Sequence, residues 1–402
     1  MKFFLKIYYL AIILLLFLGI NVLAKFGIFV EFDNAPIWQK ILPSAYLLIP
    51  ISICALINSK TVTFYKCEYH LHFLFLFMLL SLYVKGNAGY IGVINCNVFP
   101  VTLSIVTYFF LSSRTLSRCK TLYQIVMSFY LLECALSIFE RIFGMNIFPF
   151  LGSGTANILN YSSFMEGFRS TALQNHPLQN SLCVSVVMAY VLCSNMNVKK
   201  KLSLFFLGYL AILCFNTRGS IVLWGFFFIV YLLFNLKKYK GSSRLSLILV
   251  AVIGAFIMAC LILNYGLADR LIKNGLLDES SAGQRLQLLD IFNYISLKDL
   301  LFGISSNQQQ KLLDFVNVGI VENPWLVIAF VHGIIILLIM IYLYYKLFKR
   351  LFREYCLFDK LFISFTFLII ASTNNSLVTP GAYLPLFLLC SYIFSPKYKI
   401  IK

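Results

Sequence analysis

The sequence predicts an all-α polytopic integral membrane protein with about twelve transmembrane helices. Of its 402 residues, 60% are hydrophobic and only 12% are charged, whereas a soluble domain is typically about 25% charged. Apolar runs of about 20 residues, enough to cross a bilayer as a helix, recur along the chain. Basic residues gather at alternate ends of these runs. Because no stretch has the composition of a soluble domain, we expect one membrane domain over residues 1–402.

Each expected span is an apolar run bounded by short polar breaks. In chain order, the spans cover residues 3–23, 41–57, 70–86, 98–112, 121–140, 176–195, 202–216, 220–236, 245–264, 324–345, 358–374 and 382–395. Two longer connections remain, residues 141–175 and residues 265–323.

The basic residues determine the expected topology. They cluster at every second boundary: Lys2 and Lys6; Lys60 and Lys66; Arg114, Arg118 and Lys120; Lys199, Lys200 and Lys201; Lys237, Lys238, Lys240 and Arg244; Lys346, Lys349, Arg350 and Arg353; Lys397, Lys399 and Lys402. Cytoplasmic loops carry an excess of Lys and Arg, so we expect both termini in the cytoplasm and both long connections outside it. This distribution explains the net charge of +18, and no nucleic acid partner is expected.

The two external connections differ in character. Residues 141–175 are rich in Gly, Ser and Asn, which predicts a mostly irregular segment with a re-entrant piece. Residues 265–323 contain "SAGQRLQLLDIFNYIS", which predicts an amphipathic helix at the membrane surface. Ser281 is its candidate N-cap. Its apolar face consists of Leu286, Leu289, Phe292 and Ile295.

Three arginines in short, distinctive contexts map to the external side, which the positive-inside rule depletes of basic residues. They are Arg169 in "GFRST", Arg218 in "NTRGS" and Arg285 in "AGQRLQLLD". Each of them alone fits an interfacial anchor. Together they fit a phosphate site better, because the planar guanidinium fork matches phosphate oxygens bidentately. Two or three of them would hold a diphosphate and stabilise the charge that develops as it leaves.

Four segments carry a family resemblance: "GFRSTALQNHP", "NTRGSIVLWGFF", "GQRLQLLDIFNYISLKDLLFGISSN" and "VENPWLVIAFVHGIIILLIMIYLYYKLFKR". Their order and spacing resemble those of the O-antigen polymerase and O-antigen ligase superfamily, over about residues 165–350. The resemblance implies a glycosyltransferase-C-like enzyme of the external membrane face that needs no metal or other cofactor. Its substrate would be an oligosaccharide on undecaprenyl diphosphate. Membrane lipids, a chain-length regulator and a flippase would be its partners.

The resemblance also implies residue roles. Arg169, Arg218 and Arg285 correspond to arginines that hold phosphate and sugar. His176 and Pro177 form the "HP" that follows the first arginine, although a histidine before a helix also fits a cap or a headgroup contact. The chain departs from the ligases at Glu322 in "VENPW", because ligases usually carry a histidine just before that asparagine.

A glutamate at this position fits the polymerases better. Glu322 would accept the proton of an acceptor hydroxyl, or else interact with the positive end of the following helix. His332 inside that helix is expected to make an interhelical hydrogen bond. Glu31 and Asp33 resemble the acidic pair of other polyprenyl-dependent glycosyltransferases, but a solvated loop is the favoured interpretation.

The sequence therefore predicts a polymerase of O-antigen or a similar surface polysaccharide, in the bacterial inner membrane with its active face in the periplasm. It would transfer the growing glycan from undecaprenyl diphosphate to the next lipid-linked repeat unit. Arg218 and Glu322 would be catalytic, and Arg169, His176, Arg218 and Arg285 would bind the diphosphate and glycan. Two alternatives stay open: a ligase that transfers the glycan to lipid A-core, and a flippase or transporter of the lipid-linked unit.

Overall fold

The structure is a computed structural model of the whole chain. It describes residues 2–29, 36–57, 102–104, 106–107, 116–148, 150–151, 158–159, 168–174, 176–237, 241–274, 287–316, 318, 321, 323–373, 377–378 and 381–396. The spans expected over residues 70–86 and most of 98–112 lie outside these residues. So do Glu31, Asp33, Ser281, Arg285 and Glu322.

The described residues are almost entirely helical, as the sequence predicts. The helices are α1 (Lys2–Phe17), α2 (Ile20–Lys25), η1 (Ile37–Lys40), α3 (Pro43–Ile57), α6 (Leu116–Phe143), α7 (Pro177–Cys193), α8 (Val198–Phe215), α9 (Arg218–Asn235), α10 (Ser242–Tyr265), α11 (Asp269–Asn274), η3 (Leu288–Asn293), α13 (Leu297–Phe302), α14 (Ser306–Phe315), α15 (Pro324–His332), α16 (Ile334–Leu351), α17 (Leu357–Ser372) and α18 (Tyr383–Ile393). The two-residue strands β1 (Phe150–Leu151) and β2 (Ile158–Leu159) form an antiparallel pair.

Three helical stretches in the described part are long and apolar enough to cross a membrane: Cys119–Phe143, Arg218–Asn235 and Arg244–Tyr265. Shorter apolar helices cover Phe3–Phe17, Pro43–Cys54, Pro177–Cys193 and Tyr383–Ile393. On α10, large apolar side chains such as Val252 and Phe256 are more than half exposed. A helix with such an outward face needs an apolar solvent, so these helices indicate a membrane-embedded protein.

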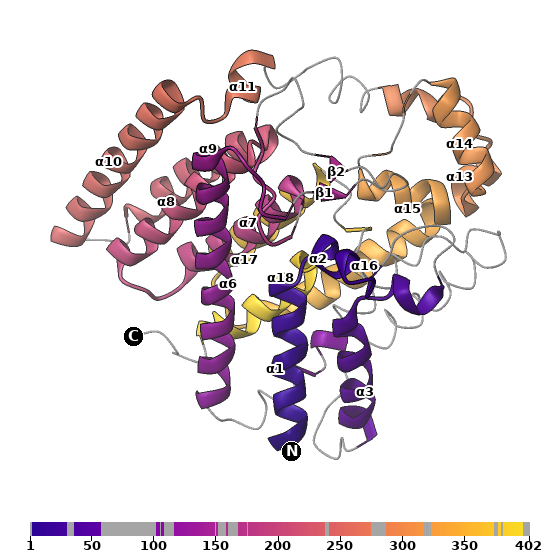
Figure 1. Cartoon of the computed structure of the whole chain (residues 1–402), viewed down its shortest axis with the longest axis horizontal. Coiled ribbons are helices and arrows are strands. Elements are labelled where there is room, and N and C mark those ends of the chain that lie inside the picture. The colour runs from indigo at the N-terminus through magenta and orange to yellow at the C-terminus, as the bar shows by residue number, and fades with distance from the viewer. Residues whose placement is uncertain are drawn as a thin grey trace.

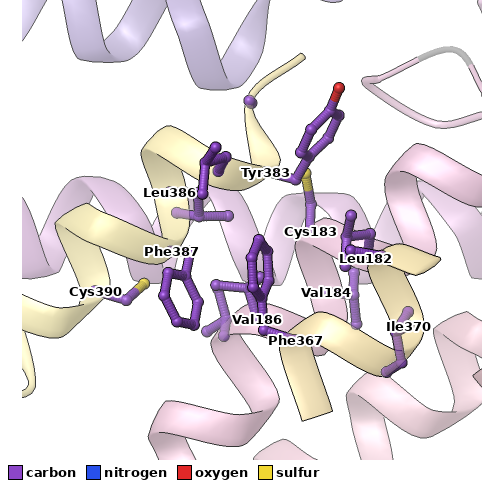
Figure 2. Packing of buried hydrophobic residues seen from close by; sticks show 14 of the residues in the cluster. Leu182, Cys183, Val184, Val186, Phe367, Ile370, Tyr383, Leu386, Phe387 and Cys390 are labelled. Carbon is purple, nitrogen blue, oxygen red and sulfur yellow. The ribbon is translucent and has the colours of Figure 1, made fainter. Parts of the chain in front are cut away.

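Helix α7 lies at the centre of the core. It is apolar on all sides and almost all of its residues are buried, which is the pattern of a helix surrounded by others. It packs against α8, α17 and α18. In Figure 1, α8 and α10 lie on one side of α7 and α17, and α13 to α15 lie on the other. Figure 2 shows Phe387 of α18 beside Phe367 of α17, with their ring centroids 4.1 Å apart.

Two expected spans are interrupted. The run over residues 3–23 ends at Phe17, and α2 begins at Ile20. The run over residues 324–345 is divided at Gly333, whose φ of 91° and ψ of 160° are incompatible with a continuing helix. The break leaves the carbonyl of Phe330 free for a tertiary contact, and the Ile304 N–H donates to it at 2.7 Å. Hydropathy did not reveal this break, because long apolar stretches flank His332 and Gly333 on both sides.

The second long connection contains short helices. Within residues 265–323, α11, η3, α13 and α14 are described, and the segment expected as an amphipathic α-helix is a 3-10 helix in its described part. Leu288 and Ile291 of η3 are buried against the bundle. Helix α14 begins with a capping box between Ser305 and Gln308.

Gly333 provides a test of the break between α15 and α16. A Cβ at this position would overlap the carbonyl of Leu301, and the residue has a positive φ. We expect Gly333→Ala to destabilise the protein by roughly 2 kcal/mol or more. Gly225→Ala is the matched control, because a Cβ there would meet only the Tyr209 hydroxyl at 3.9 Å. The control should be neutral or slightly stabilising in thermal unfolding in detergent. Equal melting temperatures for the two variants would contradict the packing described.

Candidate anion-binding site

The site is organised around residues Phe168–Gln174, which we call the strap. The strap runs without helix or strand between α6 and the C-terminal end of α8. The Ser170 N–H donates to the carbonyl of Cys214 at 3.1 Å, and the Ser170 hydroxyl donates to the carbonyl of Ser137 at 2.7 Å. The Arg169 Nε lies 3.4 Å from the Phe215 carbonyl that accepts its hydrogen bond. The strap therefore holds Arg169 at the end of α8.

Two buried carboxylates of α6 accept the N–H groups of the strap. Glu140 Oε2 accepts from Thr171 at 2.7 Å and from Ala172 at 3.0 Å, and its Oε1 accepts from Ile147 at 2.8 Å. Glu133 Oε2 accepts from Leu173 at 3.1 Å. Both glutamates are fully buried. An irregular segment inside a bundle needs such partners, because a buried N–H without an acceptor is costly.

The strap leads directly into α7. The Gln174 N–H donates to Asn180 Oδ1 at 3.0 Å, and Asn180 Nδ2 donates back to the Thr171 carbonyl. His176 is the N-cap of α7, and its Nδ1 accepts from the Leu178 N–H at 3.2 Å. Pro177 occupies the first helical position, where its missing N–H has no cost. The "HP" motif thus begins the central helix, as the sequence predicts.

The turn between α8 and α9 lies against the strap. Asn216 ends α8 in the left-handed conformation, with φ 54° and ψ 43°. Its Nδ2 donates to the Phe168 carbonyl at 3.4 Å and also to Asp269 Oδ1 at the start of α11. Thr217 is the N-cap of α9, but its side chain accepts no capping hydrogen bond, and its hydroxyl donates to Ser181 Oγ of α7 at 3.0 Å. Thr217 therefore does not cap the positive end of α9, where Arg218 holds the first position.

These contacts bring Arg169, His176 and Arg218 to one region. Arg169 donates a hydrogen bond to the carbonyl of Phe215, just before the α8–α9 turn. Thr217 of that turn donates to Ser181 of α7, five residues after His176. Burial, with the nearby Arg169 guanidinium, lowers the pKa of His176 from 6.5 to about 3. His176 is therefore neutral at physiological pH. With Nδ1 accepting from Leu178, the proton of the neutral ring is on Nε2.

The sequence interpretation missed three residues of this region: Glu133, Glu140 and Arg141. Arg141 donates to the carbonyl of Phe168 at 2.9 Å and to the carbonyl of Gly266 at 2.8 Å. A signal for the glutamates was present, since two carboxylates seven residues apart in an apolar run share one helix face. His332 is buried at the end of α15.

No family model, curated protein or solved structure matches the chain. The chemistry of the site is therefore the basis for assigning a function. Arg218 is the first residue of the 18-residue helix α9, and Arg169 bonds the Phe215 carbonyl three residues before it, so two permanently charged residues and the first N–H groups of α9 come together in one region. Both features favour an anion with several oxygens. Within the described residues, no cluster of three or more His, Cys, Asp or Glu side chains could hold a metal ion.

His176 gives the site a pH signature. Because the pKa is about 3 in the folded protein and 6.5 ordinarily, the unfolded chain binds more protons between these values. We expect the free energy of unfolding to fall as the pH is lowered from 7 to 4. His176→Asn keeps a capping oxygen but cannot titrate, so its stability should depend less on pH in this range. Thermal unfolding in detergent at several pH values measures this. Parallel curves for the two proteins would contradict the neutral, buried histidine.

Proposed function

We propose that this protein is a polysaccharide polymerase that transfers a growing glycan from undecaprenyl diphosphate to the next lipid-linked repeat unit. It would work at the periplasmic face of the bacterial inner membrane, with about twelve spans, cytoplasmic termini and a glycosyltransferase-C-like architecture. One observation carries the proposal: Arg169 bonds the end of α8 and lies near neutral His176, and Arg218 begins α9 just beyond that point, where Thr217 does not cap the helix. The four segments that resemble O-antigen polymerases and ligases agree with it.

The reaction requires a hydroxyl of the acceptor sugar to attack the anomeric carbon of the donor glycan. The bond between that carbon and the phosphate oxygen breaks, and undecaprenyl diphosphate leaves with an additional negative charge. Arg169 and Arg218 would hold the diphosphate and stabilise this charge, assisted by the N–H groups at the start of α9. The proton of the acceptor hydroxyl must go to a base, a role that we assign to Glu322 in this proposal. Arg285 would complete the phosphate contacts.

His176 has a separate role in this proposal. Its low pKa keeps it neutral, so it adds no charge to the diphosphate site. The ring Nδ1 accepts from the Leu178 N–H in the cap of α7, and in this proposal the Nε2–H would donate to a phosphate or sugar oxygen of the bound substrate. We therefore assign His176 to orientation of the substrate rather than to proton transfer.

The arginines provide the decisive test. In a strain that lacks this protein, lipid A-core should carry a single repeat unit, and the wild-type protein should restore long chains. Arg169→Ala and Arg218→Ala should each lower polymer formation by roughly 100-fold or more. The lysine variants should keep part of the activity, since they retain charge without the bidentate fork. Lipopolysaccharide gels at matched expression measure chain length.

Arg244→Ala is the control, because Arg244 is exposed at the start of α10 and away from the site. Normal chains with Arg218→Ala would overturn the assigned roles. The deletion strain also distinguishes the alternatives. Full-length polymer left on undecaprenyl diphosphate would indicate a ligase. Absence of any repeat unit on the core would indicate a flippase.

A further inference from the structure

The end of α6 presents two adjacent residues of opposite charge to the strap. Glu140 accepts the N–H groups of Thr171 and Ala172. Arg141 donates to the carbonyl of Phe168 and, through its other terminal nitrogen, to the carbonyl of Gly266. The guanidinium carbon of Arg141 also lies 5.9 Å from the ring centroid of Phe168. One helix end therefore bonds the strap on both sides of Arg169.

The conformation of the strap explains why a carboxylate is needed. Ala172 has a φ of 34°, in the left-handed region that alanine rarely adopts. A backbone that changes hand in this way turns consecutive N–H groups toward one point, an arrangement that normally binds an anion. Here the anion is a side chain of the same protein. The Thr171 and Ala172 N–H groups both meet Glu140 Oε2, while Glu140 Oε1 accepts from Ile147.

Glu133 accepts fewer hydrogen bonds from the protein than Glu140 does. It accepts one strap N–H, from Leu173, through Oε2, and its Oε1 is buried with no hydrogen-bond partner in the described part of the chain. Both carboxylate oxygens of Glu140 accept hydrogen bonds, from three backbone N–H groups in total. Replacing Glu140 with glutamine would leave one acceptor oxygen and turn an NH2 group toward backbone N–H groups. The strap therefore depends more on Glu140.

We propose that Glu140 and Arg141 are positioning residues that set Arg169 against the α8–α9 turn, so that the two arginines can bind one anion together. This inference rests on the proposed function, because the anion is the diphosphate of the lipid-linked substrate. The two residues act through the strap and do not touch the substrate. A displacement of about 1 Å in a binding group can lower a rate about 100-fold, so a strap that loses its anchor should lose activity while the fold persists.

A cysteine introduced into the strap tests whether Glu140 holds the strap in place, independently of catalysis. Ser170 is fully buried, so the thiol introduced by Ser170→Cys should react slowly with maleimide in purified protein. Mass spectrometry of the strap peptide distinguishes it from the native cysteines. We expect Glu140→Gln to raise the rate of modification at position 170 at least about tenfold. Glu354→Gln makes the same chemical change at an exposed position and should leave the rate unchanged.

Kinetics test the positioning role. With purified lipid-linked repeat unit as substrate, Glu140→Gln should raise KM and lower kcat/KM by about tenfold or more, and Glu140→Asp should restore part of the loss because it keeps the carboxylate. Folded Glu140→Gln with unchanged thiol reactivity and unchanged KM would overturn the inference. If Glu140→Gln does not fold, Arg141→Lys makes the same test, since one ammonium cannot bond both carbonyls in the same geometry.

The two proposals fail in different ways. If Arg169→Ala and Arg218→Ala polymerise normally, the proposed function is wrong, whatever the thiol at position 170 does. Suppose instead that those variants are inactive, while Glu140→Gln shows slow modification of the thiol at position 170 and a normal KM. The proposed function then stands, and the positioning role of Glu140 is wrong. Increased thiol reactivity with normal KM also overturns the positioning role, because the strap would then move without consequence for the substrate.

Discussion

The buried carboxylates of α6 need hydrogen-bond donors, and the N–H groups of the irregular strap need acceptors, so each provides the partners that the other requires. A glutamate within an apolar helix is costly, and so is a backbone segment whose N–H groups have no partners inside a bundle. Glu140 and Glu133 accept the N–H groups of Thr171, Ala172 and Leu173, so both costs are reduced by the same hydrogen bonds. Removal of either partner leaves the other buried without compensation, which makes this contact the constraint on which the surrounding structure depends.

The rest of the site follows from the position of the strap. Its N-terminal half fixes Arg169 beside the end of α8, and its C-terminal half delivers His176 to the start of α7. Asn216 then connects the α8–α9 turn to Phe168 and to Asp269 of α11. Helices that are distant in the sequence therefore meet around one short segment. The relative positions of these helix ends depend on hydrogen bonds from side chains to backbone carbonyls.

The sequence predicted the helices better than their interruptions. Hydropathy located α7, α8, α9 and α10 to within a few residues, because each is a long apolar run between polar breaks. It did not separate α15 from α16, since the break depends on the backbone angles of Gly333 and on a close approach by Leu301 that no local pattern encodes. Arg169, His176 and Arg218 were selected from their positions and from the family resemblance, and their roles in binding stay predictions. Glu133 and Glu140 were missed because hydropathy averages them with apolar neighbours, although their spacing on one helix face was visible.

The start of α9 illustrates how packing and binding are related. A threonine before a helix commonly caps its first N–H groups, and loss of such a cap costs about 1 kcal/mol. Thr217 instead donates its hydroxyl to Ser181, a contact between two buried residues that ties α9 to α7. A conventional cap would compete with a bound phosphate for the same N–H groups. The contact with Ser181 joins the two helices, and Thr217 provides no cap that would compete for those N–H groups. The side-chain conformation of Thr217 therefore matters for the proposed phosphate site, because a threonine turned to cap α9 would occupy N–H groups that the proposal assigns to the diphosphate.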